Sequence, residues 1–210
     1  AHVGHVQGCA LMALAHRWTS RNLSRLELVA AILVLALVVG AFLERGLRVF
    51  AAAEERSLQA TVLNMNSALR ILFYQLVMAD HAAEVAHWQD ANPIRLLGDP
   101  GAALEMETLT EYPELARFHA VAAGLGARYQ GEFDYIDPES IDGGQWYFDR
   151  SESLLVFRVR NGEFFRSALA GAPRIRFRLD VQYNPDSDVP ADVALRPVDE
   201  YHWTEASVKP

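Results

Sequence analysis

One carboxylate at the edge of a long apolar run is the first candidate for chemistry in this sequence. Glu27 directly precedes residues 28–43, a stretch without a charged side chain. A carboxylate at the boundary of a membrane-spanning helix is costly unless it meets a cation or reaches water, and such residues are commonly functional. Two interpretations stay open: Glu27 is functional or paired with a cation, or it is an interfacial residue that extends to water.

Two acidic loops suggest a metal ion. The candidate ligands are Asp134, Asp137 and Asp142 in one loop and Asp186 and Asp188 in another. Carboxylate oxygens are the ligands that Ca²⁺ prefers, but the spacing is not that of an EF-hand. A bound Ca²⁺ is therefore one hypothesis and a pair of solvated loops is the other, and we expect no other cofactor.

The sequence contains no motif that is typical of catalysis. It lacks a nucleophile elbow, a phosphate-binding loop and a His-Glu-x-x-His helix, so we predict that the chain is not an enzyme. His2 and His5 are too few ligands for a metal site, and Cys9 is the single cysteine, which rules out an intrachain disulfide. The net charge of -8 argues against a nucleic-acid partner held by phosphate neutralisation.

The apolar run predicts a membrane-spanning helix. Residues 28–43 would span roughly 24 Å at 1.5 Å per residue, somewhat less than a bilayer core of about 30 Å, and Leu23 and Leu26 extend the run. The alternative is a buried core helix, which usually keeps a polar stripe that this run lacks. Three arginines precede it: Arg17, Arg21 and Arg25. Positive charge before the run favours a cytoplasmic N-terminus and an exported remainder.

Beyond the apolar run the pattern becomes that of an amphipathic helix. Apolar residues recur at spacings of three and four: Leu58, Val62, Met65, Leu69, Leu72 and Leu76. These positions share one face of a helix, which packs either on the chain's own sheet or on another subunit. No proline occurs before Pro93, so we expect this helix to continue to about Gln89.

The C-terminal part changes to the period of two that is typical of strands. Residues 174–183 alternate polar and apolar side chains throughout and predict the strongest strand. We expect further strands at residues 146–148, 154–160 and 193–195. The dipeptide Asn161-Gly162 predicts a tight type I′ hairpin turn. Together they predict about four antiparallel strands, with one face covered by the helix.

Several arginines share the opposite face of the predicted sheet. They are Arg158, Arg160, Arg174, Arg176 and Arg178. Like charges opposite one another destabilise a sheet, so we expect acidic groups to approach this face, with residues 134–142 as the candidates. The alternative is a solvated arginine face whose long stems cover apolar surface.

These elements predict an α+β chain in which a long N-terminal membrane-spanning helix continues into an amphipathic helix packed on a small antiparallel β-sheet. Residues 1–22 are a basic leader or cytoplasmic segment, and residues 23–50 are the transmembrane part of the helix. Residues 51–91 are the amphipathic helix, and residues 92–210 are a connecting segment and a β-rich periplasmic head domain.

The residues around Glu27 resemble a known family. The segment Leu23-Ser24-Arg25-Leu26-Glu27-Leu28-Val29, followed by the apolar run, is similar to the N-terminal segment of type IV pilins and type II secretion pseudopilins. Residues 129–160 resemble the C-terminal domain of such pilin-like proteins. Asn22 stands where the family's leader ends in Gly, and Glu44 stands where many pilins carry a proline.

The resemblance implies a structural subunit of a pilus or secretion assembly in the bacterial inner membrane, with its head in the periplasm. Implied partners are other pilin-like subunits, the lipid bilayer, an assembly platform and a prepilin peptidase that cleaves between Asn22 and Leu23. Some pseudopilins also bind calcium in the head. The alternative from another class is a bitopic membrane protein whose periplasmic domain binds or senses a ligand.

The resemblance also gives Glu27 a role. It stands at the fifth position counted from Leu23, where the family's glutamate neutralises the amine of a neighbouring subunit. If the chain is not cleaved after Asn22, Arg25 or Arg21 of a neighbour supplies the cation instead.

We predict that Glu27→Gln leaves the chain folded and membrane-inserted but lowers its incorporation into assemblies. The substitution keeps the shape of the side chain but removes the negative charge that would pair with a cation of the neighbouring chain. Cross-linking of membranes that carry either form measures the difference. Intact-mass measurement of the membrane form separates a chain that begins at Leu23 from one that retains Asn22. Assembly of Glu27→Gln at the wild-type level would leave Glu27 as an ordinary interfacial residue.

Overall fold

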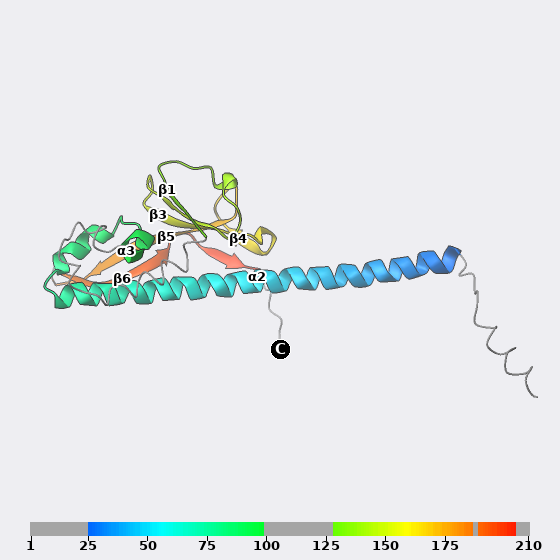
Figure 1. The fold of residues 1–210 in the computed structure, drawn as a ribbon, viewed down its shortest axis with the longest axis horizontal. Helices are drawn as coiled ribbons and strands as arrows, with labels where there is room; N and C mark the ends of the chain where they lie inside the picture. Colours follow the sequence, from blue (N-terminus) through cyan, green and yellow to red (C-terminus); the bar gives the residue numbers. More distant parts are fainter. Residues whose placement is uncertain (1–24, 99–127, 187–188, 205–210) are drawn as a thin grey trace, which may run out of the picture. The chain divides into compact units, whose positions relative to one another are not determined.

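The protein combines one long helix with a mixed β-sheet, as an α+β chain (Figure 1). The computed structural model describes residues 25–98, 128–186 and 189–204. The chain divides into two compact units, Ala1–Gly46 and Leu47–Pro210. Helix α2 (Arg25–Met78) supplies the described residues of the first unit and the opening element of the second.

Helix α2 ends earlier than the sequence pattern predicts. We expected helix to about Gln89, but α2 stops at Met78 because Asp80 adopts a left-handed backbone conformation with φ 63°. The Asp80 N–H donates to the Val77 carbonyl and the His81 N–H donates to the Leu76 carbonyl, at 3.2 and 2.8 Å. This is the Schellman arrangement, which satisfies the last carbonyls of a helix. Asp tolerates this conformation better than most residues, so no glycine or proline marks the end.

Two short helices follow α2 and close one end of the second unit. They are η2 (Ala82–Trp88), which buries Trp88, and α3 (Pro93–Gly98). Asn92 starts α3, because its side-chain carbonyl accepts from the Ile94 N–H at 3.0 Å. The buried Asn92 amide also donates to the Tyr129 hydroxyl and to Glu132. Burial is the main reason that the pKa of Tyr129 is raised to about 12.

The described part of the second unit contains seven strands in two sheets. Five strands form a mixed sheet in the order β1-β2-β3-β5-β6, and β4 pairs with β7 separately. The strands are β1 (Tyr129–Phe133), β2 (Trp146–Asp149), β3 (Leu154–Arg158), β4 (Phe165–Ser167), β5 (Arg174–Tyr183), β6 (Pro190–Pro197) and β7 (Tyr201–Trp203). Strand β5 confirms the strongest predicted strand. The four predicted strands, β2, β3, β5 and β6, pair antiparallel as expected. The sheet is nevertheless mixed, because an additional strand, β1, runs parallel to β2.

The predicted hairpin at Asn161-Gly162 is also wrong. Strand β3 pairs with β2 and β5, and the next strand, β4, belongs to the other sheet. A type I′ turn needs positive φ at both central residues, whereas Asn161 has φ −92° and is followed by a short 3₁₀ helix, η6 (Gly162–Phe164). Gly162 is required for a different reason: a Cβ there would lie 2.5 Å from Cγ of Pro173.

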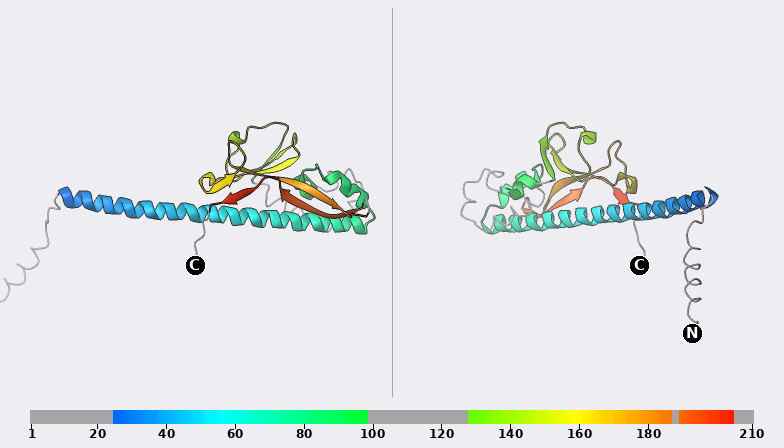
Figure 2. Two further views of the ribbon diagram at one scale, coloured as in Figure 1. Left: turned by 180° about the vertical axis from the view of Figure 1, so that it is seen from behind. Right: turned by 45° about the vertical axis from the view of Figure 1, so that its right-hand side comes forward.

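The main core lies between α2 and one face of the five-stranded sheet, which lies along one side of the helix in both views of Figure 2. The predicted helical stripe is confirmed: its residues are buried, with Val62 partly buried. Their partners on the sheet include Leu155, Phe177 and Leu195. The opposite face is not simply solvated, because a second cluster of Tyr147, Leu154, Val156 and Ile141 covers part of it.

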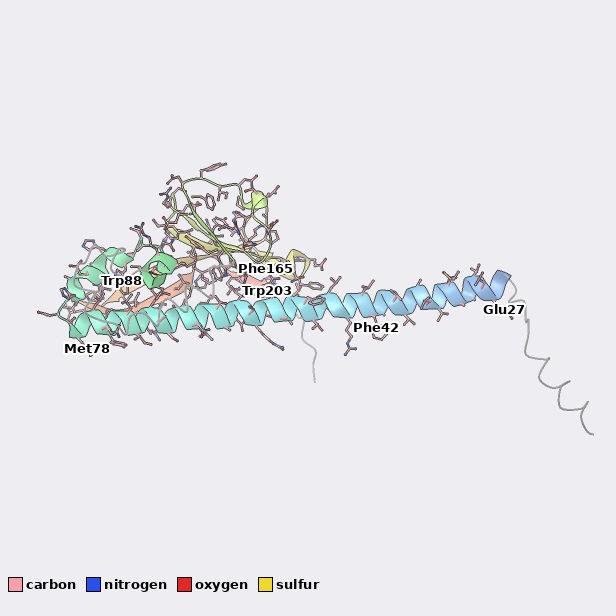
Figure 3. All side chains as sticks on the ribbon, in the orientation of Figure 1. Glu27, Phe42, Met78, Trp88, Phe165 and Trp203 are labelled. Atoms are coloured by element: carbon pink, nitrogen blue, oxygen red, sulfur yellow. The ribbon has the colours of Figure 1, made fainter. Side chains whose placement is uncertain are left out.

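A small aromatic cluster packs where the two-stranded sheet meets this core. The Phe165 and Trp203 rings, marked in Figure 3, lie edge to face with centroids 5.3 Å apart. Tyr201 stacks on Phe165 at 5.9 Å. Burial is the main reason that the pKa of Tyr201 is raised. Strands β4 and β7 therefore add apolar cover rather than a separate domain.

Three polar side chains of α2 hold the helix on the sheet. The Glu54 carboxylate accepts from the backbone N–H of Arg160 and from the backbone and side-chain N–H of Asn161, at 2.6–2.9 Å. Asn66 pairs with the Leu195 backbone of edge strand β6, accepting from its N–H at 2.6 Å. The Asn66 amide also donates to the Leu195 carbonyl at 3.4 Å. Arg70 makes a two-pronged ion pair with Asp192, with N–O distances of 3.0 and 2.8 Å.

We predict that Asn66→Leu lowers the free energy of unfolding by about 1–3 kcal/mol, because the Leu195 N–H loses its acceptor. Asn64→Leu is the matched control, since Asn64 is an exposed asparagine of the same helix. Urea unfolding of the full chain in detergent micelles, followed by tryptophan fluorescence, measures both. Equal effects of the two substitutions would contradict the role of Asn66.

Candidate membrane and assembly surface of helix α2

The first part of α2 has the surface of a membrane-spanning helix. Among the described residues, one helix is long and apolar enough to cross a bilayer, and its most apolar window is entirely exposed. Large apolar side chains point outward along residues 28–43; Phe42, labelled in Figure 3, is 73% exposed. A run of this length and composition is compatible with a membrane-spanning helix.

Glu27 lies in the first turn of α2 with an exposed side chain (Figure 3). A carboxylate is favourable there, because the N-terminus of a helix carries a partial positive charge. This position gives Glu27 a structural reason to be acidic in addition to any pairing with a neighbour. The expected processing junction, Asn22 and Leu23, lies outside the described residues.

A second apolar stripe runs along the outer face of α2 in the second unit. Its residues recur at spacings of three and four: Ala60, Leu63, Ser67, Ile71, Tyr74 and Met78. They lie two positions out of phase with the buried stripe, which is about 200° around the helix and therefore on the opposite side. Leu63, Ile71, Tyr74 and Met78 are 66%, 51%, 55% and 79% exposed. We call these six residues the outer stripe.

The rotation of α2 about its axis decides that the outer stripe is exposed. The buried stripe packs on the sheet, and Asn66 and Arg70 fix the same region from the polar flank. Turning the outer stripe inward would break both contacts and expose the core residues. Exposed apolar patches of this kind mark sites of interaction with proteins or membranes.

The predicted arginine face exists for Arg158, Arg174, Arg176 and Arg178, whereas Arg160 lines a groove beside α2. The compensation of this face differs from what we expected. Arg176 donates to both oxygens of Asp199 at 2.7 and 2.8 Å and to Glu152 at 2.7 Å. Arg158 and Arg174 lie directly opposite each other, and both donate to backbone carbonyls, such as Pro173 O for Arg158 and Ala170 O for Arg174. Carbonyl dipoles and the acids Asp199 and Glu152, rather than the acids at 134–142, therefore compensate this face.

The acidic loop at 134–142 is used for local contacts. Asp134 accepts from Arg150 at 2.8 Å, and Asp137 accepts from the Glu139 N–H at the start of η5 (Pro138–Ser140). The side chains of Asp142 and Asp186 are exposed, and Asp188 lies outside the described residues. Within the described ranges, no three His, Cys, Asp or Glu side chains are grouped so as to hold a metal ion. Calcium binding stays a prediction.

Sequence reasoning missed two features of this surface. The outer stripe is present in the sequence as a second series with a helical period, but only the stripe with the larger residues was used. The second feature is the set of polar contacts of Glu54, Asn66 and Arg70, whose partners are more than a hundred residues away in the sequence. Polar residues on the flank of a buried stripe are the available signal.

Comparison with known proteins gives no relative. No family model matches the chain, and neither a curated protein nor a solved structure matches it.

The Arg176–Asp199 pair predicts a pH dependence of stability. Hydrogen bonds from Arg176 are the main cause that lowers the pKa of Asp199 below its ordinary 3.8. A lowered pKa stabilises the fold above pH 3.8, and this contribution is lost as the pH falls through the folded-state pKa. Asp199→Asn should therefore be clearly less stable than wild type at neutral pH, with the difference shrinking in acid.

Urea unfolding at a series of pH values measures this difference. Asp186→Asn, which changes an exposed aspartate, is the control and should show little difference at any pH. A gap between Asp199→Asn and wild type that stays constant down to acid pH would contradict the assignment to this carboxylate.

Proposed function

We propose that this chain is a membrane-anchored, pilin-like structural subunit that assembles with further copies through helix α2. The observation that carries the proposal is the outer stripe, an exposed apolar face on a helix whose opposite face is already buried by its own sheet. A monomer gains nothing from this second face. Copies packed helix to helix would remove it from water.

Burial of the outer stripe supplies enough free energy to matter. Covering Leu63, Ile71, Tyr74 and Met78 would contribute roughly 1–2 kcal/mol for each residue, given that each is about half or more exposed. Ala60, before these residues, and Ser67, between them, are small and allow helices to approach closely. Arg56 ends the stripe with a charge, and Asn64 borders it on one side with a polar group.

The apolar run before the second unit supports the same proposal. A helix anchored in a bilayer is held in a common orientation with its neighbours, so contacts between copies form at a high effective concentration. The order of anchor, amphipathic helix and covering sheet is the order that pilin-like subunits have. Under this proposal the helices form the interior of the assembly and the sheets lie outside. The protein is then a structural subunit of a pilus or secretion machine of the inner membrane and catalyses no reaction.

We predict that the double substitution Leu63→Glu with Ile71→Glu abolishes assembly while the chain stays folded and inserted, because carboxylates in the helix contact would be desolvated. Chemical cross-linking of native membranes should give ladders for wild type and monomers for the variant. The control is Gln59→Glu, which adds a carboxylate on an exposed flank of the same helix.

The same experiment separates the proposal from its alternative. A bitopic membrane protein that binds or senses a ligand would give at most cross-linked dimers in the wild type. Ladders that persist at the wild-type level in the double variant would contradict assembly through the outer stripe.

A further inference from the structure

A groove of about 430 Å³ opens between α2 and the sheet at the start of the second unit. Phe50, Ser57 and Thr61 line it from the helix. Arg128, Trp146 and Arg160 line it from the sheet and the segment that leads into it. Neither the core packing nor the proposed assembly contact uses this space, since the outer stripe lies on another face of α2.

The groove carries an excess of positive charge. Two exposed arginines, Arg128 and Arg160, line it together with one carboxylate, that of Glu54. Both oxygens of Glu54 already accept hydrogen bonds from the backbone and side chain of residues 160–161. The lining therefore favours an anion that can accept from guanidinium groups.

The guanidinium of Arg160 is held in place for such an anion. Its Nε donates to the Gly143 carbonyl at 3.1 Å, while no acceptor among the described residues lies within hydrogen-bond range of its terminal nitrogens. Gly144 has φ +88°, and a Cβ at this position would lie 2.8 Å from Nη2 of Arg160. The glycine thus allows the backbone to lie directly against the guanidinium.

The walls of the groove are apolar beside these charges. Phe50 supplies exposed aromatic surface, and the largely buried rings of Trp146 and Phe157 form the floor. Leu47 and Phe50 are exposed apolar residues at the first turns of this unit. Phe50 follows the end of the apolar run, Leu43, by seven residues, or about 10 Å of helical rise. The sequence therefore places the groove soon after the apolar run, where an anionic phospholipid is an amphiphile that an anchored chain would meet.

We propose that the groove binds the phosphate of an anionic phospholipid headgroup, with Arg128 and Arg160 as the donors and Phe50 against the apolar part of the lipid. The charge excess selects the anion, and the aromatic walls select an amphiphile over a free phosphate ion. This lipid site goes beyond assembly, because a single anchored copy contains all of it.

Native mass spectrometry of the full chain in detergent tests the proposal. The probes are phosphatidylglycerol, zwitterionic phosphatidylcholine and soluble glycerol phosphate. Wild type should retain phosphatidylglycerol in preference to the other two. Arg128→Gln with Arg160→Gln should weaken that retention about tenfold, as expected for loss of charge-assisted hydrogen bonds. Arg95→Gln with Arg178→Gln, two exposed arginines elsewhere, is the charge-matched control and should retain the lipid.

A second variant covers the case in which the arginine substitutions disturb folding. Ala53 lines the groove with an exposed side chain, so Ala53→Phe fills it without changing charge and should also lower phosphatidylglycerol retention. Equal loss in the control pair would overturn the proposal in favour of general electrostatic attraction. Equal retention of phosphatidylcholine or glycerol phosphate would also overturn it. Unchanged lipid retention with loss of cross-linked ladders would assign the groove to an acidic segment of a second copy.

Discussion

The packing of one face of α2 on the five-stranded sheet is the interaction on which the rest of the structure depends. Leu58, Leu69 and Leu76 lie at the centre of that contact and are buried together with Phe177 and Leu195 of the sheet. Within the described residues, η2 and α3 add to this cover, with Trp88 and Leu97 buried in the same core. The contact also fixes how the helix is rotated, and the rotation determines which side chains remain at the surface.

Polar contacts refine this packing instead of competing with it. Strand β6 is an edge strand whose backbone would be open to unwanted pairing. The Asn66 side chain accepts from the Leu195 N–H of this strand, a hydrogen bond that another strand could otherwise make. Glu54 does the same for the N–H groups where the chain leaves β3. A helix held by its core packing and by these polar contacts presents a defined outer stripe. A repeated contact between identical subunits requires such a defined surface.

The sequence predicted the elements whose signal is local. The buried stripe and β5 follow from periods of 3.6 and 2, and both are confirmed. The early end of α2 was missed because Asp80 replaces the usual glycine, and parallel β1 was missed because Gly131, at φ 113°, interrupts its alternation. The polar contacts of Glu54 and Asn66 depend on partners distant in sequence, so no local pattern announces them.

Photocross-linking from the outer stripe tests the central claim most directly, because it needs no matching residue on the partner. A photoactivatable phenylalanine analogue would be placed at Ile71, or at Gln59 on the flank of the same helix, and irradiated in native membranes. We predict covalent adducts between copies from position 71 and few from position 59, since only Ile71 belongs to the outer stripe. Equal adduct yields from both positions, or none from position 71, would contradict assembly through this face.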